Sequence, residues 1–183
     1  KFVEMLKDQH IMNLKEMNKF GDRNVNAIRK MPTHHIILIA QNDIGRYNLY
    51  QLITASHMTY YARRPRIPKS LINEHREGII IGSACEAGEL YQALLDERSD
   101  ETIANIVSFY DYLEIQPVGN NEFMIRSERV ENVNSIEDIQ KFNQKIVDLG
   151  EQFHKPVVAT CDVHFLNPDD AIYRSILLAG KGF

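Results

Sequence analysis

The chain has 183 residues, of which 44% are hydrophobic and 25% are charged, and its formal net charge is -4. These proportions are typical of a globular protein with one sizeable core. They exclude a global attraction to nucleic acid, which needs an excess of clustered Lys and Arg. No apolar run approaches the roughly 20 residues that cross a bilayer, and the start lacks the apolar core of a signal peptide. The chain is therefore predicted to be cytoplasmic, without membrane contact.

Hydrophobic periodicity predicts helices that alternate with short, β-branched strands. A helix over residues 2–17 and an irregular linker to Pro32 come first. Strands are then predicted at 36–40, 78–82, 112–115, 123–125 and 157–160, and helices at 44–58, 70–76, 86–95, 102–110, 135–153 and 169–178, with a turn at 117–121. The continuous apolar runs favour parallel strands covered on both faces, hence an α/β fold that presents functional residues at the C-terminal ends of its strands.

The helix at 135–153 carries the clearest start signal. Ser135 and Asp138 resemble a capping box with Asp in place of Glu, in which the two side chains satisfy free backbone N–H groups. Apolar residues then recur at three- and four-residue steps as far as Phe153.

Asp162-Val163-His164 follows directly on the predicted strand at 157–160. If extended structure persists, the carboxylate and the imidazole project to the same side and offer oxygen and nitrogen to a divalent metal. The alternative is a His bonded to a neighbouring loop and an Asp that caps the helix beginning near Pro168.

The two cysteines, Cys85 and Cys161, are expected to be free thiols, because their predicted compartment is reducing. Cys85 follows the strand at 78–82, where Gly82 would allow a ligand to approach the backbone, and it is either a thiolate ligand of zinc or a small buried hydrophobe. Cys161 should face away from Asp162 and lie in the core.

His34 and His35 stand at the start of the first predicted strand, where each is either a ligand or a His bonded to a carbonyl group. The single basic cluster is Tyr60–Lys69, with Arg63, Arg64, Arg66 and Lys69. Its arginines suit phosphates and its tyrosines suit unpaired bases. Alternatively, this segment is a solvated loop or contacts another domain.

Taken together, five segments resemble the PHP (polymerase and histidinol phosphatase) domain of replicative bacterial polymerases, closest to the PolC-type DNA polymerase III alpha subunit. They are HIILIAQN at 35–42, PRI at 65–67, GSACEAGE at 82–89, YDYLEIQP at 110–117 and ATCDVHF at 159–165. The resemblance covers roughly residues 32–183 and implies part of a distorted, TIM-like (β/α)7 barrel, incomplete in this chain.

The resemblance also implies metal ligands at His35, Cys85, Asp162 and His164, with His34 as second choice for His35. It implies zinc or manganese in the PHP site, and magnesium for the parent polymerase. The family's amino-terminal ligand motifs find no match before residue 32, and residues 1–31 resemble the closing helix of an inserted exonuclease, followed by a linker. The implied partners are DNA through the parent polymerase, the missing amino-terminal half of the domain, the exonuclease domain and replisome subunits.

The predicted function is that of a part of a replicative DNA polymerase, in which the PHP domain is a scaffold and retains a multi-metal phosphoesterase site. Two alternatives stay open at this point. One is a free-standing, metal-dependent PHP phosphatase, and the other is a non-catalytic domain that binds a neighbouring domain or DNA through the basic cluster.

Overall fold

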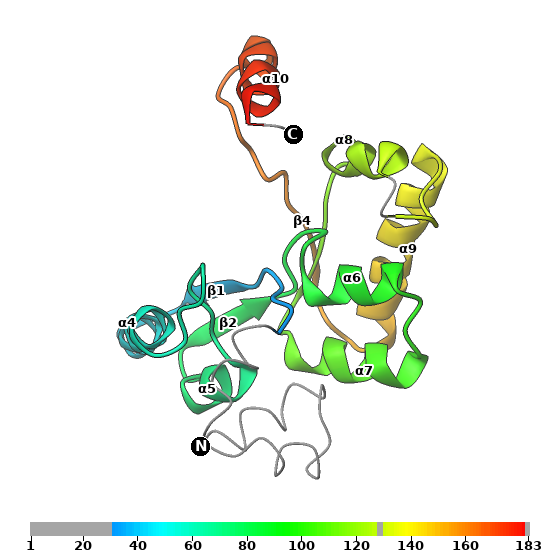
Figure 1. The fold of residues 1–183 in the computed structure, drawn as a ribbon. Helices are drawn as coiled ribbons and strands as arrows, with labels where there is room; N and C mark the ends of the chain where they lie inside the picture. The colour runs from blue at the N-terminus through cyan, green and yellow to red at the C-terminus, as the bar shows by residue number, and fades with distance from the viewer. Residues whose placement is uncertain (1–30, 128–129, 182–183) are drawn as a thin grey trace. The chain divides into compact units, whose positions relative to one another are not determined.

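The computed structural model describes residues 31–127 and 130–181 (Figure 1). The helix predicted at 2–17 lies outside these ranges. The predicted domain boundary between residues 31 and 32 lies at the first described residue, so the residues on its amino-terminal side are not described. The described residues form two compact units, of which the first ends at Leu113 and the second begins at Glu114. Helices and strands mix in both units, as the α/β prediction requires.

Within residues 31–113, the first unit combines a two-stranded sheet with four helices. Its elements are β1 (Ile37–Ala40), α4 (Asp43–Met58), α5 (Lys69–Glu74), β2 (Ile79–Gly82), α6 (Glu89–Leu95) and α7 (Asp100–Phe109), followed by β3 (Leu113–Ile115) at the boundary. The fully buried side chains include Leu52, Ile72, Ile81, Leu90, Val107 and Tyr110. The strands and helices predicted here are confirmed, although α6 begins three residues later than expected.

The pairing of β1 with β2 is antiparallel and runs from Ile37 opposite Gly82 to Ala40 opposite Ile79. The predicted parallel arrangement is therefore wrong for these two strands, and so is the prediction that β1 is covered on both faces, since Ile37 and Ile39 are 37% and 45% exposed. Antiparallel pairing has a direct consequence for the site. The residues that precede β1 lie at the same end of the sheet as the residues that follow β2.

One carboxylate fixes β2 to the start of β3. Asp111 accepts hydrogen bonds from the backbone N–H of Ile81 and from the guanidinium of Arg76, both at 2.7 Å. Beyond the strand, the backbone N–H of Ser83 donates to Tyr112 O at 3.3 Å. The chain that leads to Cys85 therefore starts from an anchored strand end.

The second unit packs a long helix near a second small sheet. Its elements are α8 (Val118–Asn121), the 3-10 helix η2 (Glu122–Arg126), α9 (Ile136–Gln152), β4 (Val157–Ala159), the 3-10 helix η3 (Pro168–Asp170) and α10 (Ala171–Gly180), and β4 pairs with β3. The strand predicted at 123–125 is wrong, because these residues form η2. The turn predicted at 117–121 includes α8, and β4 is not buried as expected, since Val158 is 42% exposed.

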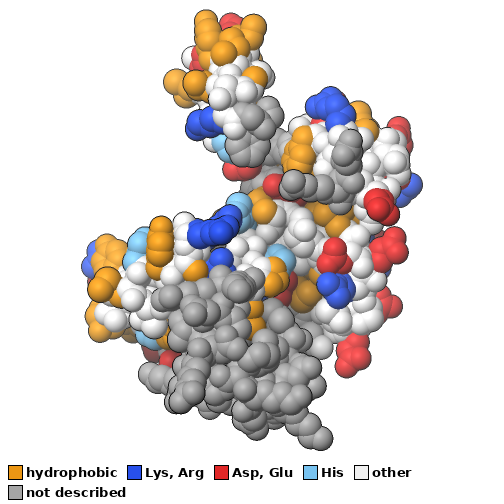
Figure 2. All heavy atoms as spheres, viewed as in Figure 1, with side chains coloured by type: hydrophobic (Ala, Val, Ile, Leu, Met, Phe, Trp, Pro, Cys, Tyr) orange, Lys and Arg blue, Asp and Glu red, His pale blue; other side chains and the backbone are white. Residues whose placement is uncertain are grey.

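Helix α10 contributes no buried residue to the second unit. Hydrophobic side chains gather over it in Figure 2, and Ile172, Tyr173, Ile176 and Leu177 are each more than 60% exposed. No helix in the described part of the chain is both long and apolar enough to cross a membrane.

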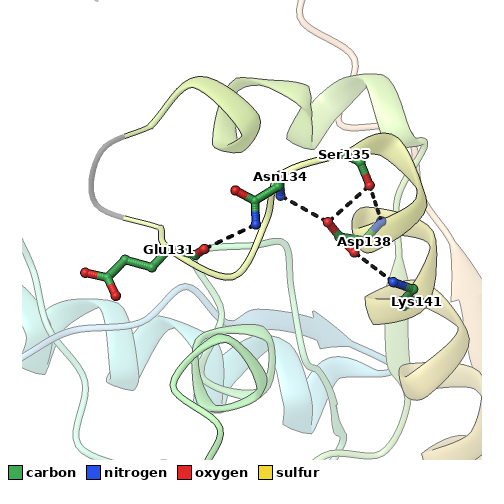
Figure 3. Close-up of polar contacts among 5 residues, drawn as sticks. All are labelled: Glu131, Asn134, Ser135, Asp138 and Lys141. Atoms are coloured by element: carbon green, nitrogen blue, oxygen red, sulfur yellow. Dashed lines mark hydrogen bonds and ion pairs between the residues drawn. The ribbon is translucent and has the colours of Figure 1, made fainter.

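The predicted cap of α9 is confirmed (Figure 3). The Ser135 hydroxyl accepts from the backbone N–H of Asp138 at 3.3 Å, and Asp138 in turn accepts from the backbone N–H of Asn134 at 3.1 Å. Lys141, followed by these backbone and hydroxyl donors, lowers the pKa of Asp138 to about 2. Because the folded-state pKa lies below the ordinary value of 3.8, this stabilisation is present above about pH 4 and is lost as the pH falls toward about 2.

Replacing Ser135 with Ala should lower the free energy of unfolding by about 1 kcal/mol, because an N-terminal N–H group of α9 loses its acceptor. Urea denaturation measures the change. The matched control is Ser108→Ala, since Ser108 lies within α7 and its hydroxyl donates to Ala104 O of the same helix, away from the helix N-terminus. Equal stability of the Ser135→Ala variant and the wild type would contradict this role of the cap.

Candidate metal centre

His35 and Cys85 meet at one end of the first sheet. His35 precedes β1 and Cys85 follows β2, so the antiparallel pairing brings together two residues that are 50 positions apart. The Nδ1 atom of His35 lies 3.3 Å from Sγ of Cys85. Within the first unit, the structure thus brings together two of the predicted ligands.

A tight turn from Cys85 to Gly88 fixes this geometry. The backbone N–H of Gly88 donates to Cys85 O at 2.8 Å, and that of His35 donates to Ala87 O at 2.9 Å. A Cβ atom at Gly88 would stand 2.2 Å from Ser83 O, so only glycine fits there. Immediately before the turn, Ala84 has a φ of 61°, a left-handed conformation that alanine rarely adopts.

Gly82 has a different role from the one expected. A Cβ atom there would lie 2.3 Å from the ring of Tyr112, so glycine is required for packing against that side chain. The contact with Tyr112 therefore accounts for glycine at this position, and the approach of a ligand stays a prediction.

Burial raises the pKa of the half-buried Cys85 thiol to about 11, and the nearby Glu86 carboxylate adds to the effect. Without a cation, Cys85 is therefore a neutral thiol at neutral pH, and its S–H group can donate to Nδ1 of His35. A bound cation would favour the thiolate, which is the form that ligates metal.

His34 remains apart from this contact. Partial burial lowers the pKa of its imidazole, and the Glu89 carboxylate opposes that effect. Of these two histidines, His35 is the one that contacts Cys85, which favours His35 over His34 as the ligand.

Asp162 and His164 form a second pair, within the second unit. Nδ1 of His164 lies 2.6 Å from the backbone oxygen of Asp162 and 3.9 Å from the carboxylate atom Oδ2. A carbonyl oxygen only accepts, so Nδ1 carries a proton, and Nε2 is the nitrogen left to bind a metal. This is the tautomer of a His that ligates through Nε2 while its other nitrogen is held by a carbonyl group.

The backbone at Asp162 differs from the extended triplet that was predicted. Strand β4 ends at Ala159, and Asp162 has a φ of 47°, which turns the chain out of the strand direction. Cys161 is consequently exposed, so its predicted place in the core is wrong. Left-handed residues other than glycine concentrate at functional sites, and two of them lie here: Asp162 itself, and Ala84 directly before Cys85.

The basic cluster is partly engaged within the fold. Nη1 of Arg66 donates to Met31 O at 2.9 Å, and its Nε atom is buried. Arg63 and Arg64 are exposed, and Arg63 has a φ of 64°. Contacts with phosphate would therefore fall mainly on Arg63 and Arg64.

Lys69 belongs to a cluster that the sequence did not predict. It pairs with Glu89 and lies 4.6 Å above the ring of Phe109, while the Tyr110 hydroxyl donates to Glu89 at 3.2 Å. Burial raises the pKa of Tyr110, and Glu89 raises it further. Glu89 is the first residue of α6 and directly follows the turn from Cys85 to Gly88. Its contacts with Lys69 and Tyr110 therefore hold the end of the turn at Gly88 in place.

The residues fit zinc by their donor atoms. Nitrogen and sulfur ligands of a tetrahedral zinc ion stand about 3.6 Å apart, given bonds of about 2.0–2.1 and 2.3 Å, and the contact between His35 and Cys85 is close to that separation. Among residues 31–127 and 130–181, no group of three or more His, Cys, Asp or Glu side chains is placed to hold one ion. The described geometry thus gives one pair of candidate ligands within each unit.

Comparison with known proteins identifies the relatives of this chain. A family model described as PHP domain matches residues 8–117. A DNA polymerase III PolC-type from Clostridium perfringens is 50% identical over 182 residues, which is 100% of this chain and 12% of that protein. Proteins of the same name from Caldanaerobacter subterraneus and Bacillus subtilis are 47% identical over 160 residues (87% of the chain, 11% of that protein) and 38% identical over 182 residues (98% and 12%). These matches confirm the resemblance found in the sequence motifs.

The raised pKa of Cys85 predicts its reactivity in protein stripped of metal. In a Cys161→Ser background, alkylation by iodoacetamide should accelerate about tenfold per pH unit from about pH 8 to about pH 10, because the thiolate is the nucleophile. Mass spectrometry of the labelled peptide gives the rate. A plateau reached below about pH 9 would contradict a pKa near 11.

Proposed function

The chain belongs to the PHP domain family, and from this premise we propose that it forms part of the PHP domain of a PolC-type replicative DNA polymerase. The support is that relatives named DNA polymerase III PolC-type match along the chain at 38% to 50% identity. The chain spans only 12% of the length of these relatives. DNA-directed DNA synthesis is accordingly proposed for the whole protein and assigned to no residue of this chain.

The second proposal concerns architecture. The chain supplies strands and helices to a distorted (β/α)7 barrel whose other part is contributed by the rest of the protein. Support comes from the two-stranded size of each sheet and from the apolar face of α10, whose side chains are exposed in the second unit. Residues 1–31 are proposed to be the closing helix of an exonuclease domain and a linker, and this boundary lies within the stretch from residue 8 onward that the PHP family model matches.

The third proposal is that His35, Cys85, Asp162 and His164 contribute ligands to the metal centre of this domain. The observation that carries it is the 3.3 Å contact between Nδ1 of His35 and Sγ of Cys85, held by backbone hydrogen bonds on both sides. A thiolate ligand favours zinc over magnesium or manganese. When bound, a divalent cation supplies Lewis acidity and charge neutralisation for the hydrolysis of a phosphoester.

The residues of the chain have distinct tasks in this proposal. Cys85 releases its proton on binding, and His35 supplies a ring nitrogen from the other strand. Asp162 offers carboxylate oxygen, while His164 presents Nε2 because its Nδ1–H is held by the Asp162 carbonyl group. Arg63 and Arg64 are proposed to contact DNA or a neighbouring domain, with Arg66 and Lys69 supporting their segment. From the polymerase assignment we also propose that the parent protein binds replisome subunits and that it is cytoplasmic.

Metal analysis of the full-length protein tests the proposal. Mass spectrometry should find stoichiometric zinc in the wild type, and Cys85→Ser and His164→Ala should each lose part of it. The control is His57→Ala, because the contacts of the His57 ring with described residues are with its own helix and with Tyr61. Unchanged zinc in the His164→Ala protein would remove His164 from the ligand set. A wild type without metal would leave the domain as a scaffold, and the phosphoesterase proposal would be dropped.

A further inference from the structure

Glu114 is a buried residue of the segment YDYLEIQP at 110–117, and the proposed function gives its side chain no role. It stands on β3, only 6% exposed. A buried charge is costly unless hydrogen bonds satisfy it, so its partners are informative. One of them is Thr160, whose hydroxyl donates to Oε2 of Glu114 at 2.9 Å.

Thr160 is held through its backbone as well as its side chain. Its backbone N–H donates to Ile115 O at 3.0 Å, so successive residues of β3 receive the two hydrogen bonds. Thr160 is the first residue after β4, and Asp162 is only two positions further on. The contact with Glu114 therefore fixes the chain where it leaves the sheet and turns toward the two candidate ligands.

A second side chain supports the next residue. Nδ2 of Asn120 donates to Cys161 O at 2.8 Å. Asn120 lies in α8, which follows β3 after Pro117, so the short segment from Glu114 to Asn120 contacts both residues that precede Asp162. No strand or helix includes Cys161 through His164, and Asp162 has a left-handed backbone. These polar contacts, rather than regular structure, define where the triplet begins.

We propose that Glu114 is a positioning residue for the ligands Asp162 and His164, acting through the hydroxyl of Thr160, with Asn120 as a second support. The inference rests on the proposed function, in which Asp162 and His164 bind metal. Residues that orient ligands typically change metal affinity by about 10- to 100-fold when they are replaced. A structural contact that has no bearing on the ligands would leave that affinity unchanged.

The test compares Thr160→Val with Thr160→Ser in the full-length protein. Valine keeps the shape of threonine and removes the hydroxyl, whereas serine keeps the hydroxyl. The zinc ion of interest is the one that the His164→Ala variant loses. Competition with a chelating dye measures the affinity of each protein for that ion. Thr160→Val should raise its dissociation constant about 10- to 100-fold, and Thr160→Ser should restore nearly wild-type affinity. A direct variant, Glu114→Gln, should weaken zinc binding in the same sense if it folds.

The melting temperature in excess chelator separates positioning from stability. Comparable melting of the two Thr160 variants, together with weak zinc binding by the valine variant alone, supports the proposal. Equal zinc affinity in Thr160→Val and the wild type overturns it and leaves the proposed metal centre intact. If His164→Ala loses no zinc, the metal ligands themselves are wrong, and this inference fails with them.

Discussion

The antiparallel pairing of β1 with β2 is the constraint on which the contact between His35 and Cys85 depends. It sets the residue before one strand beside the residue after the other, so that His35 and Cys85 come within 3.3 Å. The turn from Cys85 to Gly88 completes the arrangement, since His35 donates its backbone N–H to Ala87. A shift of one residue in the register would turn alternate side chains to the opposite face and carry His35 away from the turn.

The pair Asp162 and His164, within the second unit, is organised in another way. Asp162 and His164 lie beyond the end of β4, and their starting point is defined by hydrogen bonds to Thr160 and Cys161. Such an arrangement places carboxylate and imidazole on an exposed segment while the groups that orient them stay in or near the core. Glu114 is the buried end of that support. A metal ligand on a loop can then be held firmly, because the cost of ordering the loop is offset by a few directed polar contacts.

Local features could be predicted from the sequence, and pairings between distant residues could not. The cap at Ser135 and the helix that follows depend on neighbours three or four positions apart, so their pattern is visible in the chain. The antiparallel partner of β1 lies about 40 residues away, and nothing local specifies its direction. Cys161 was misplaced for a similar reason, because extrapolating the strand could not foresee the positive φ of Asp162. The ligand candidates were predicted from their places at the ends of strands and from motif resemblance, which indicate the residues and not the geometry of their side chains.

The central claim is that Cys85 ligates zinc beside imidazole nitrogen. X-ray absorption at the zinc edge, on the full-length protein loaded with zinc, tests it most directly. The account predicts a sulfur atom at about 2.3 Å together with nitrogen or oxygen atoms at about 2.0–2.1 Å, and loss of the sulfur signal in Cys85→Ser. A wild-type spectrum with nitrogen and oxygen neighbours alone would contradict it.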